Sequence, residues 1–276
     1  MLTLVVLFVA SLPSFGQAKA ANTGAIPRIN GKPDMTGVWA GPGFKFTEGK
    51  NVPEINIGAG GIARNLPPFA PGGEKLFNLE KNGDPIHDDP QLLCYPHGMP
   101  RIALASHAQQ FIQGNNYLSI HYEDDHFYRA IPMDGRAHAK DLDPYGTGGT
   151  FMGNAVGHWE GDTLVVDTVG LRPWWLDARD HMHSDALHVI ERFTMTGPQR
   201  MKYELALDDP KIFTKPFTNT WEMRMMPNWE LEEYICEDNN KDLELIKFLE
   251  KEKDKKYEIL AANYADYANG AHSIDV

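Results

Sequence analysis

The stretch Ala186–Asp209, ALHVIERFTMTGPQRMKYELALDD, decides the fold class of the chain. Apolar side chains occupy alternate positions on both sides of Gly197-Pro198, a pair of residues that favours a tight turn. Alternation with a period of two is typical of strands that bury one face. We therefore predict two antiparallel strands joined in a hairpin.

Segments of the same kind lie before and after this hairpin. Each is a short apolar or alternating run that ends at turn residues such as Gly-Asn-Asn, Asp-Asp or Asp-Gly. The predicted strands cover residues 36–40, 109–113, 117–123, 126–133 and 218–226, with a further hairpin at 151–169 that turns at Glu160-Gly161-Asp162. About nine short strands joined in this way indicate a sandwich or a sheet that closes on itself. We expect a mainly β protein with an antiparallel up-and-down barrel.

Composition divides the chain into four parts. Residues 1–20 are the expected signal peptide. Residues 21–107 are rich in proline and glycine, which indicates an irregular wrap that carries the first strand and a short helix near Gly73–Asn82. The barrel core is expected at residues 108–240. Apolar residues at helical spacing within 241–276 predict a C-terminal helix, followed by a tail.

The N-terminus determines the expected compartment. An apolar run from Leu2 to Leu12 is followed by Pro13 and by the triplet Ala18-Lys19-Ala20, which is the layout of a secretory signal peptide. The run is too short for a permanent membrane anchor. We therefore expect a periplasmic or extracellular protein whose mature chain does not insert into a membrane. The alternative is an apolar N-terminus that packs against the domain.

Export also bears on the two cysteines, Cys94 and Cys236. In an oxidising compartment an even number of cysteines favours a disulfide, and with two cysteines its connectivity is fixed. The alternative is two buried thiols. Because the chain has no Cys-x-x-Cys pair, a zinc–thiolate site is not expected.

Charge and motifs exclude several functions. The chain has 38 acidic and 26 basic residues, a net charge of −12, which argues against nucleic acid as a partner. It contains no glycine-rich phosphate or dinucleotide loop, no Gly-x-Ser-x-Gly elbow and no Cys-x-x-Cys-His motif. We therefore expect no organic cofactor.

Strand parity gives the hairpin its first candidate site. Glu191 falls on the apolar face, between Val189 and Phe193. A buried carboxylate needs a cation, hydrogen-bond donors or a proton. The same parity puts Arg129 on the apolar side of its strand. We predict an interior Glu191–Arg129 pair, which is either a structural ion pair or an anchor for a ligand.

Histidines before and within the same strand form the second candidate. His183 precedes the strand, and His188 lies on the face opposite the carboxylate. Both are candidates for acid/base catalysis because histidine titrates near neutrality. A metal site would instead use His181, His183 and His188, with a turn at Ser184-Asp185. The third interpretation is that these histidines are solvated or form structural hydrogen bonds.

Aromatic residues indicate where a ligand would approach. Trp174 and Trp175 lie in a connection between strands, where they form either a hydrophobic plug or the aromatic wall of a binding mouth. The adjacent Asp177 favours the mouth. Together with Tyr122, these residues are the predicted ligand-binding set, and we expect the two catalytic histidine candidates to line the same end of the barrel.

Five blocks of the sequence resemble those of a known family. PDMTGVW, GHWEGDTLVVDT, DGRAH, HSDALHVIERF and DDPKIFTKPFT are similar to recurring blocks of a group of uncharacterised exported bacterial proteins, over about Pro33–Asn239. The resemblance implies export and a β-rich fold, and it brings no assigned reaction. Gly37-Val38-Trp39 also resembles the Gly-x-Trp of the lipocalins, which implies a calycin-like barrel.

Two classes of function remain open from the sequence. In the first, an exported barrel binds a small apolar or aromatic molecule and acts on it by acid/base chemistry, as a lyase, an isomerase or a hydrolase. In the second, the protein is a carrier or sensor that only binds such a molecule. A metal-binding barrel that uses the histidine cluster is a further alternative.

Overall fold

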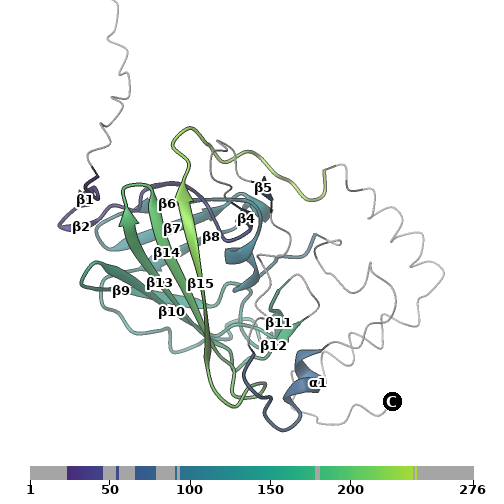
Figure 1. Ribbon diagram of the computed structural model, residues 1–276. Coiled ribbons are helices and arrows are strands. Elements are labelled where there is room, and N and C mark those ends of the chain that lie inside the picture. The colour runs from purple at the N-terminus through teal and green to yellow at the C-terminus, as the bar shows by residue number, and fades with distance from the viewer. Residues whose placement is uncertain are drawn as a thin grey trace, which may run out of the picture.

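The computed structural model describes residues 24–45, 54–55, 66–78, 91, 94–177, 181–238 and 240. Their main feature is a nine-stranded antiparallel sheet that curls into a nearly closed barrel (Figure 1). The strands of this sheet are β3 (Gly37–Ala40), β6 (Ala108–Gln113), β7 (Tyr117–Tyr122), β8 (Tyr128–Pro132), β9 (Asn154–Glu160), β10 (Thr163–Val169), β13 (His188–Gly197), β14 (Arg200–Asp208) and β15 (Phe217–Met225). Each overlaps a strand expected from the sequence, and the mainly β, antiparallel barrel is confirmed.

The barrel closes by pairing its last strand with its first. The strand order is β8-β7-β6-β3-β15-β14-β13-β10-β9, so neighbours follow one another along the chain except where β15 meets β3. That junction is short: Arg224 lies opposite Ala40, and Met225 lies opposite Trp39. The two ends of the order, β8 and β9, form a seam without a backbone ladder.

Gly157 allows the two edges of the seam to approach each other. A Cβ atom at this position of β9 would lie 3.2 Å from Cγ2 of Ile131 and 3.2 Å from Cγ of Met133. Both of those side chains come from β8 or its end, which lies beside β9. The missing side chain therefore lets β8 pack closely on β9 where the sheet is not hydrogen-bonded.

The hairpin of β13 and β14 has the parity predicted from the sequence. Along β13, Val189, Glu191 and Phe193 are buried, while His188 and Arg192 on the other face are partly exposed. β14 alternates in the same way. Because β10 and β14 hold β13 on both sides in register, its position in the sheet is fixed and its inward face is defined.

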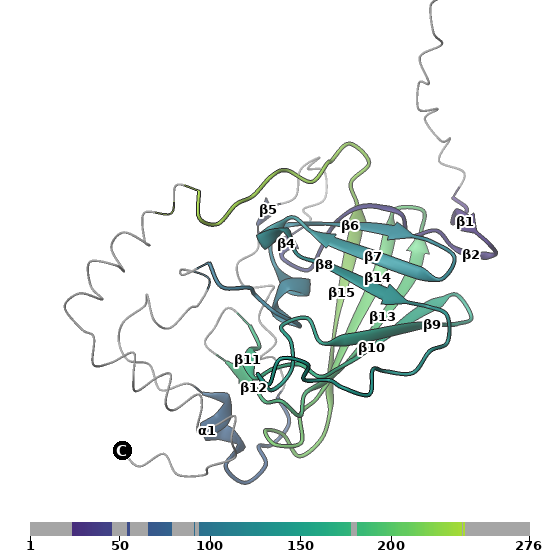
Figure 2. The ribbon, with the colours of Figure 1, turned by 180° about the vertical axis from the view of Figure 1, so that it is seen from behind.

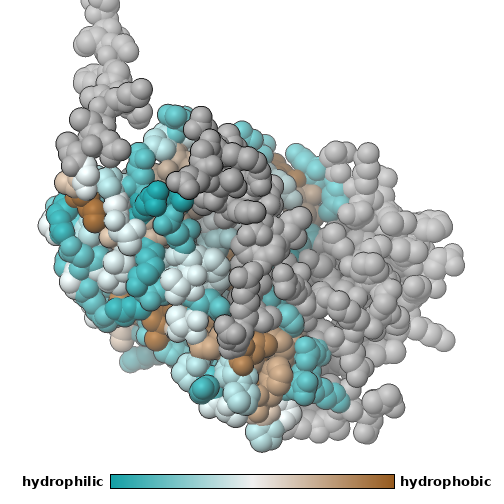
Figure 3. Space-filling model, in the orientation of Figure 1, coloured by the Kyte–Doolittle hydropathy of each residue, from teal (hydrophilic) through white to brown (hydrophobic). Residues whose placement is uncertain are grey.

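Aromatic rings pack in a continuous chain through the barrel interior. Trp39 lies 6.3 Å from Phe111, and Phe111 lies 5.5 Å from Phe193, measured between ring centroids. Phe193 stacks on Tyr203 at 4.9 Å, and Tyr203 stacks on Trp221 at 5.9 Å. Such rings bury large apolar areas, so they supply much of the hydrophobic stabilisation of the barrel. The outer surface seen in Figure 3 is mostly hydrophilic or of intermediate hydropathy, with hydrophobic residues confined to small patches.

Short elements surround the barrel. They are β1 (Arg28–Ile29) paired with β2 (Lys32–Pro33), β4 (Phe44–Lys45) paired with β5 (Glu54–Ile55), β11 (Trp174–Trp175) paired with β12 (Met182–His183), the helix α1 (Gly73–Phe77), and the 3-10 helices η2 (Arg101–Leu104) and η3 (Asp124–His126). The β11–β12 hairpin, which the sequence analysis did not predict, lies at one end of the barrel beside α1 (Figure 2). In the part of the chain that the structure describes, no helix is both long and apolar enough to cross a bilayer.

Several expectations concern segments outside the described residues. The helix expected near Gly73–Asn82 is the five-residue α1, and residues 79–82 are not described. The signal peptide expected at 1–20 and the helix and tail expected at 241–276 also lie outside the described part of the chain. These remain predictions from the sequence.

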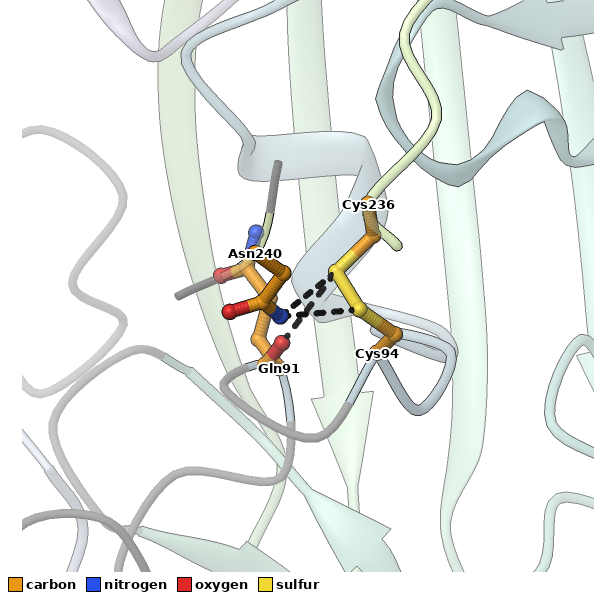
Figure 4. Close-up of a disulfide and its surroundings, with 4 residues drawn as sticks. All are labelled: Gln91, Cys94, Cys236 and Asn240. Atoms are coloured by element: carbon orange, nitrogen blue, oxygen red, sulfur yellow. Dashed lines mark hydrogen bonds between the residues drawn. A yellow bond between two sulfur atoms is a disulfide. The ribbon is translucent and has the colours of Figure 1, made fainter. Parts of the chain in front are cut away.

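The predicted disulfide is present. Cys94 and Cys236, separated by 142 residues in sequence, are bonded to each other (Figure 4). The Asn240 side-chain amide donates a hydrogen bond to the sulfur of Cys94 at 3.2 Å, and the carbonyl oxygen of Gln91 lies 3.5 Å from the sulfur of Cys236. The bond thus joins the loop that leads into β6 to the segment that follows β15.

We expect loss of this disulfide to destabilise the protein because the bond restricts the unfolded chain over a loop of 142 residues. In the chain-entropy account, a Cys94→Ser, Cys236→Ser double variant loses roughly 5 kcal/mol of unfolding free energy. Urea denaturation of both proteins measures the difference. Two thiols that react with Ellman's reagent in the denatured, unreduced wild-type protein would contradict the assignment.

Candidate functional site

The predicted interior ion pair is the centre of the candidate site. Nη2 of Arg129, on β8, lies 2.7 Å from Oε2 of Glu191, on β13. Arg129 is 3% exposed and Glu191 is 0% exposed, so both charges are removed from water. The two strands are not neighbours in the sheet, and the contact therefore crosses the inside of the barrel beneath the seam.

Three hydroxyl groups complete a polar network around this pair. Tyr203 donates a hydrogen bond to Oε1 of Glu191 at 3.0 Å. Nη2 of Arg129 donates to Oγ1 of Thr168 at 3.0 Å, and Nη1 donates to the Tyr122 hydroxyl at 3.4 Å. Glu191, Thr168 and Tyr122 thus contact the guanidinium group, and Tyr203 contacts its partner Glu191. Tyr122, predicted as a ligand-binding residue, is a member of this interior network.

Burial determines the protonation of the two tyrosines. Burial raises the pKa of Tyr122 to about 12, against the opposing effect of the Arg129 charge. Burial and the Glu191 carboxylate raise the pKa of Tyr203 well above its usual value. Burial disfavours the charge of Arg129, but the attraction of Glu191 outweighs it and raises the pKa of the guanidinium. Both tyrosines therefore carry their protons at neutral pH; Tyr203 donates to Glu191, and the hydroxyl oxygen of Tyr122 accepts from Arg129.

One donor of this network is unused. Nε of Arg129 is buried and forms no hydrogen bond. An unsatisfied buried N–H costs about 1–3 kcal/mol, so buried polar groups without a partner are uncommon. The arrangement can therefore accept one further hydrogen-bond acceptor next to the ion pair.

Replacing one member of the pair should cost more than replacing both. In Arg129→Met the carboxylate of Glu191 remains buried without its cation, and we expect a loss of about 3–5 kcal/mol in unfolding free energy. In Arg129→Met, Glu191→Leu both charges are gone and the volume is nearly kept, so most of that loss should be recovered. A double-mutant cycle from urea denaturation measures the coupling. Additive effects of the two changes would show that the pair is not coupled in solution.

The stacked aromatic rings connect the polar network to a more accessible wall. Tyr203 lies directly opposite Trp221 of β15, and Trp221 is partly exposed. Phe217 and Asn219, on the same inward face of β15, are also only partly buried. β15 pairs with β3 only at its final residues, which leaves this part of the wall less covered. The sequence analysis did not select Tyr203 or Trp221, although their strand parity marks both as inward-facing.

His183 lies in the β11–β12 hairpin and not in the barrel wall. It faces Trp174 across the hairpin and is 2% exposed. Its Nδ1 donates to the carbonyl oxygen of Ser184 at 3.0 Å, while its buried Nε2 forms no hydrogen bond. Burial lowers the pKa of His183, so the imidazole is neutral at neutral pH. This predicted catalytic residue is therefore a buried, uncharged side chain.

Neighbouring polar groups have structural roles in the same region. The backbone N–H and the hydroxyl of Ser184 both donate to the carboxylate of Asp209, each at 2.7 Å. This contact ties the segment before β13 to the residue that follows β14. Nδ1 of His181 lies 2.9 Å from Oδ2 of Asp177, which is fully buried, and the His181 ring stacks on Phe77 at 4.3 Å. Asp177, predicted to bind a ligand, is therefore held by His181.

The tryptophan pair is closer to a plug than to an open mouth. Trp174 is 8% exposed and donates from Nε1 to the carbonyl oxygen of Pro96 at 2.8 Å. The edge of its ring contacts Phe151 and Trp175, with centroids 4.8 Å apart in each case. Trp175 is partly exposed. Of the two interpretations of these residues, the surroundings of Trp174 favour the hydrophobic plug.

We expect the unfolding free energy to fall at acidic pH because His183 is buried in its neutral form. Because its pKa is lowered from 6.5 by burial, the unfolded chain takes up a proton below pH 6.5 that the folded protein does not accept. The stability that comes from the neutral imidazole is complete above pH 6.5 and is lost as the pH falls below it. His183→Asn should show a shallower loss of unfolding free energy between pH 7.5 and pH 5. Equal pH dependence in urea denaturation of the two proteins would exclude this role.

His188 points to the outside of the barrel, as strand parity predicts. Its Nε2 lies 2.8 Å from Oδ1 of Asp167 on β10, and Nε2 of His138 lies 3.0 Å from the same oxygen. The expectation that His183, His188 and Glu191 form one side of a single site is therefore not met. His188 and Glu191 lie on opposite faces of β13, one outside the barrel and one inside it. Asp167 and His138 were missed because His138 comes from a loop whose path the sequence does not define.

The three histidines of the metal alternative have separate surroundings. His181 contacts Asp177, His183 contacts a backbone carbonyl, and His188 contacts Asp167. Within the described ranges, no group of three or more His, Cys, Asp or Glu side chains is arranged to hold a metal ion. The histidine cluster expected from the sequence is not brought together.

Comparisons with known proteins add no relative. No protein-family model matches the chain, and neither the curated proteins nor the solved structures contain a significant match. The resemblance to exported bacterial proteins and to lipocalins therefore remains an expectation from the sequence, and functional inference rests on the geometry of the barrel.

Proposed function

We propose that this protein is an exported binding protein for a small aromatic molecule, which it recognises on the inner wall of the barrel. The observation that carries the proposal is the buried Arg129–Glu191 pair with its unused Nε donor. A buried ion pair often contributes no more stability than apolar residues of similar volume. A role in recognition accounts for a charge pair within an interior that is otherwise filled with apolar and aromatic side chains.

The chemistry of the site defines the class of ligand. The pair of opposite charges is neutral as a unit, so the site has no excess charge that favours an anion or a cation. The donor at Nε of Arg129 calls for a neutral acceptor such as a carbonyl or ether oxygen. The ring of Trp221, which is partly exposed and stacks on Tyr203, offers a stacking surface for an aromatic group. We therefore expect a neutral aromatic compound with at least one oxygen acceptor.

The inward face of β15 is the expected place of access. Trp221 is partly exposed there and stacks on Tyr203, whose hydroxyl contacts Glu191. Only Tyr203 then lies between a ligand that packs against Trp221 and the Glu191 carboxylate. Trp residues at such positions commonly contribute much of the binding energy.

Protonation states favour binding over catalysis at this site. Tyr122 and Tyr203 keep their protons at neutral pH because their pKa values are raised, and Arg129 keeps its charge. These groups hold their protons too firmly to exchange them with a substrate near neutral pH. A carrier or sensor is therefore the better description of the interior site than an acid/base enzyme. The apolar N-terminus supports the periplasm or the extracellular space as its location.

Titration with 6-propionyl-2-(dimethylamino)naphthalene, a neutral fluorescent aromatic ketone whose carbonyl oxygen is a hydrogen-bond acceptor, tests the proposal. We expect saturable binding at one site, and Trp221→Leu should weaken it at least tenfold because the stacking surface is lost. Trp159→Leu is the matched control, since Trp159 is also partly buried but lies on β9, at one end of the hydrogen-bonded order of strands, whereas Trp221 lies on β15 in its middle.

A second pair of variants tests whether probe binding depends on the interior ion pair or on any ion pair of the barrel. Arg129→Met, Glu191→Leu should weaken probe binding, whereas Arg192→Met, Glu160→Leu, which removes the outer-face pair at 2.6 Å, should leave it unchanged. Circular dichroism confirms that each variant is folded. Probe binding that does not saturate, or that is equally strong in the interior and outer-face variants, would contradict the proposal.

A further inference from the structure

A second group of titratable side chains lies on the outside of the barrel, apart from the interior network. Oδ1 of Asp167, on β10, lies 2.8 Å from Nε2 of His188 and 3.0 Å from Nε2 of His138. The side chains of His188, Asp167 and His138 are 37%, 32% and 25% exposed, respectively. These groups are accessible to solvent, unlike His183.

Hydrogen bonds to Asn154 and Asp167 position the side chain of His138. The backbone N–H of Ala139 donates to Oδ1 of Asn154 at 3.0 Å, so that atom is an acceptor. Nδ1 of His138 lies 3.0 Å from the same oxygen and must therefore carry a proton. Nε2 of His138 lies 3.0 Å from Oδ1 of Asp167, so the imidazole bridges Asn154 and Asp167.

The same reasoning orients His188. Nε2 of His188 donates to Asp167, which places the lone pair of the neutral imidazole on Nδ1. In the part of the chain that the structure describes, no protein group bonds to this Nδ1. A carboxylate that holds one nitrogen of an imidazole and leaves the other nitrogen as the base is the arrangement used in acid/base catalysis. Asp208 lies directly opposite His188 on β14.

Apolar side chains flank the group. Val156 of β9 and Ile190 of β13 lie on either side of Asp167 in the sheet, and both are partly buried on the outer face. Such a surface is able to hold the apolar part of a small molecule beside the imidazole. No strongly basic residue is paired directly with Asp167 in these two ladders.

We propose that His138, Asp167 and His188 form a hydrolytic site for small aryl esters, with His188 as the general base. Nδ1 of His188 takes a proton from a water molecule while the water oxygen bonds to the ester carbonyl carbon. The tetrahedral intermediate then breaks its bond to the aryloxy oxygen, which receives the proton from the imidazolium. The products are a carboxylic acid and a phenol, so one ester and one water are consumed and no further reactant is needed. Asp167 and His138 are positioning residues.

Hydrolysis of 4-nitrophenyl acetate by the full chain tests this activity. His188→Gln should lower kcat/KM at least tenfold relative to the wild-type protein. His158→Gln is the matched control: His158 is also an exposed outer-face histidine next to a carboxylate, with its Nε2 3.3 Å from Oε1 of Glu160. The control variant should keep the wild-type rate because its partner contact is exposed and it lies outside the group.

The division of the effect between kcat and KM tests the role of Asp167. Asp167→Asn should lower kcat and leave KM nearly unchanged, because the carboxylate orients the His188 imidazole and does not contact the substrate. His138→Gln should lower kcat by a smaller factor. A purely structural latch between the loop and the sheet would change thermal stability without changing kcat.

Three results would overturn the proposal. The first is an unchanged rate in His188→Gln. The second is an equal loss of rate in His158→Gln, which would indicate unspecific catalysis by surface imidazoles. The third is one equivalent of tightly bound metal in the purified wild-type protein that is lost in His188→Gln, since the three side chains would then be metal ligands. Circular dichroism of each variant verifies that the barrel is folded.

Discussion

The contact between Arg129 and Glu191 joins β8 to β13 through the interior of the barrel. The hydrogen-bonded order of strands begins at β8 and ends at β9, so the backbone alone leaves a seam. Arg129 extends from β8 to Thr168 on β10 and to Glu191 on β13, and so links the two sides of the seam from within. Gly157 complements this contact by letting β8 pack against β9. Side chains thus complete the closure that the backbone ladder does not provide.

The sequence predicted the strands, the side chains that face inward and the disulfide. The alternation around Glu191 fixed which side chains of β13 point inward, and an unpaired carboxylate in an apolar face required a cation, which pointed to Arg129. The Cys94–Cys236 bond followed from there being two cysteines and an expected oxidising compartment. Strand bounds agreed because tight turns with glycine, asparagine and aspartate separate the apolar runs.

Other features required information about register and long-range contacts. The contact of His138 with Asp167 depends on how the loop between β8 and β9 lies over the outer face, which no periodicity encodes. The stacking of Tyr203 on Trp221 depends on the pairing of β14 with β15. His183 was expected at one end of the barrel near Trp174 and Trp175; it does lie opposite Trp174, but the unpredicted β11–β12 hairpin buries it. Polar residues near a strand end can therefore have a structural role, and the sequence alone does not distinguish this role from a functional one.

The central claim is that Arg129 is buried and paired in solution, and side-chain NMR of 15N-labelled protein tests it most directly. The exchange of the Arg129 Nε–H proton with water reports on its burial, and Arg136, which is exposed at the surface, is the internal reference. The account predicts that Arg129 Nε–H exchanges at least a hundredfold more slowly than Arg136 Nε–H and that this protection is lost in Glu191→Gln. Exchange of Arg129 Nε–H as fast as that of Arg136 would contradict the account.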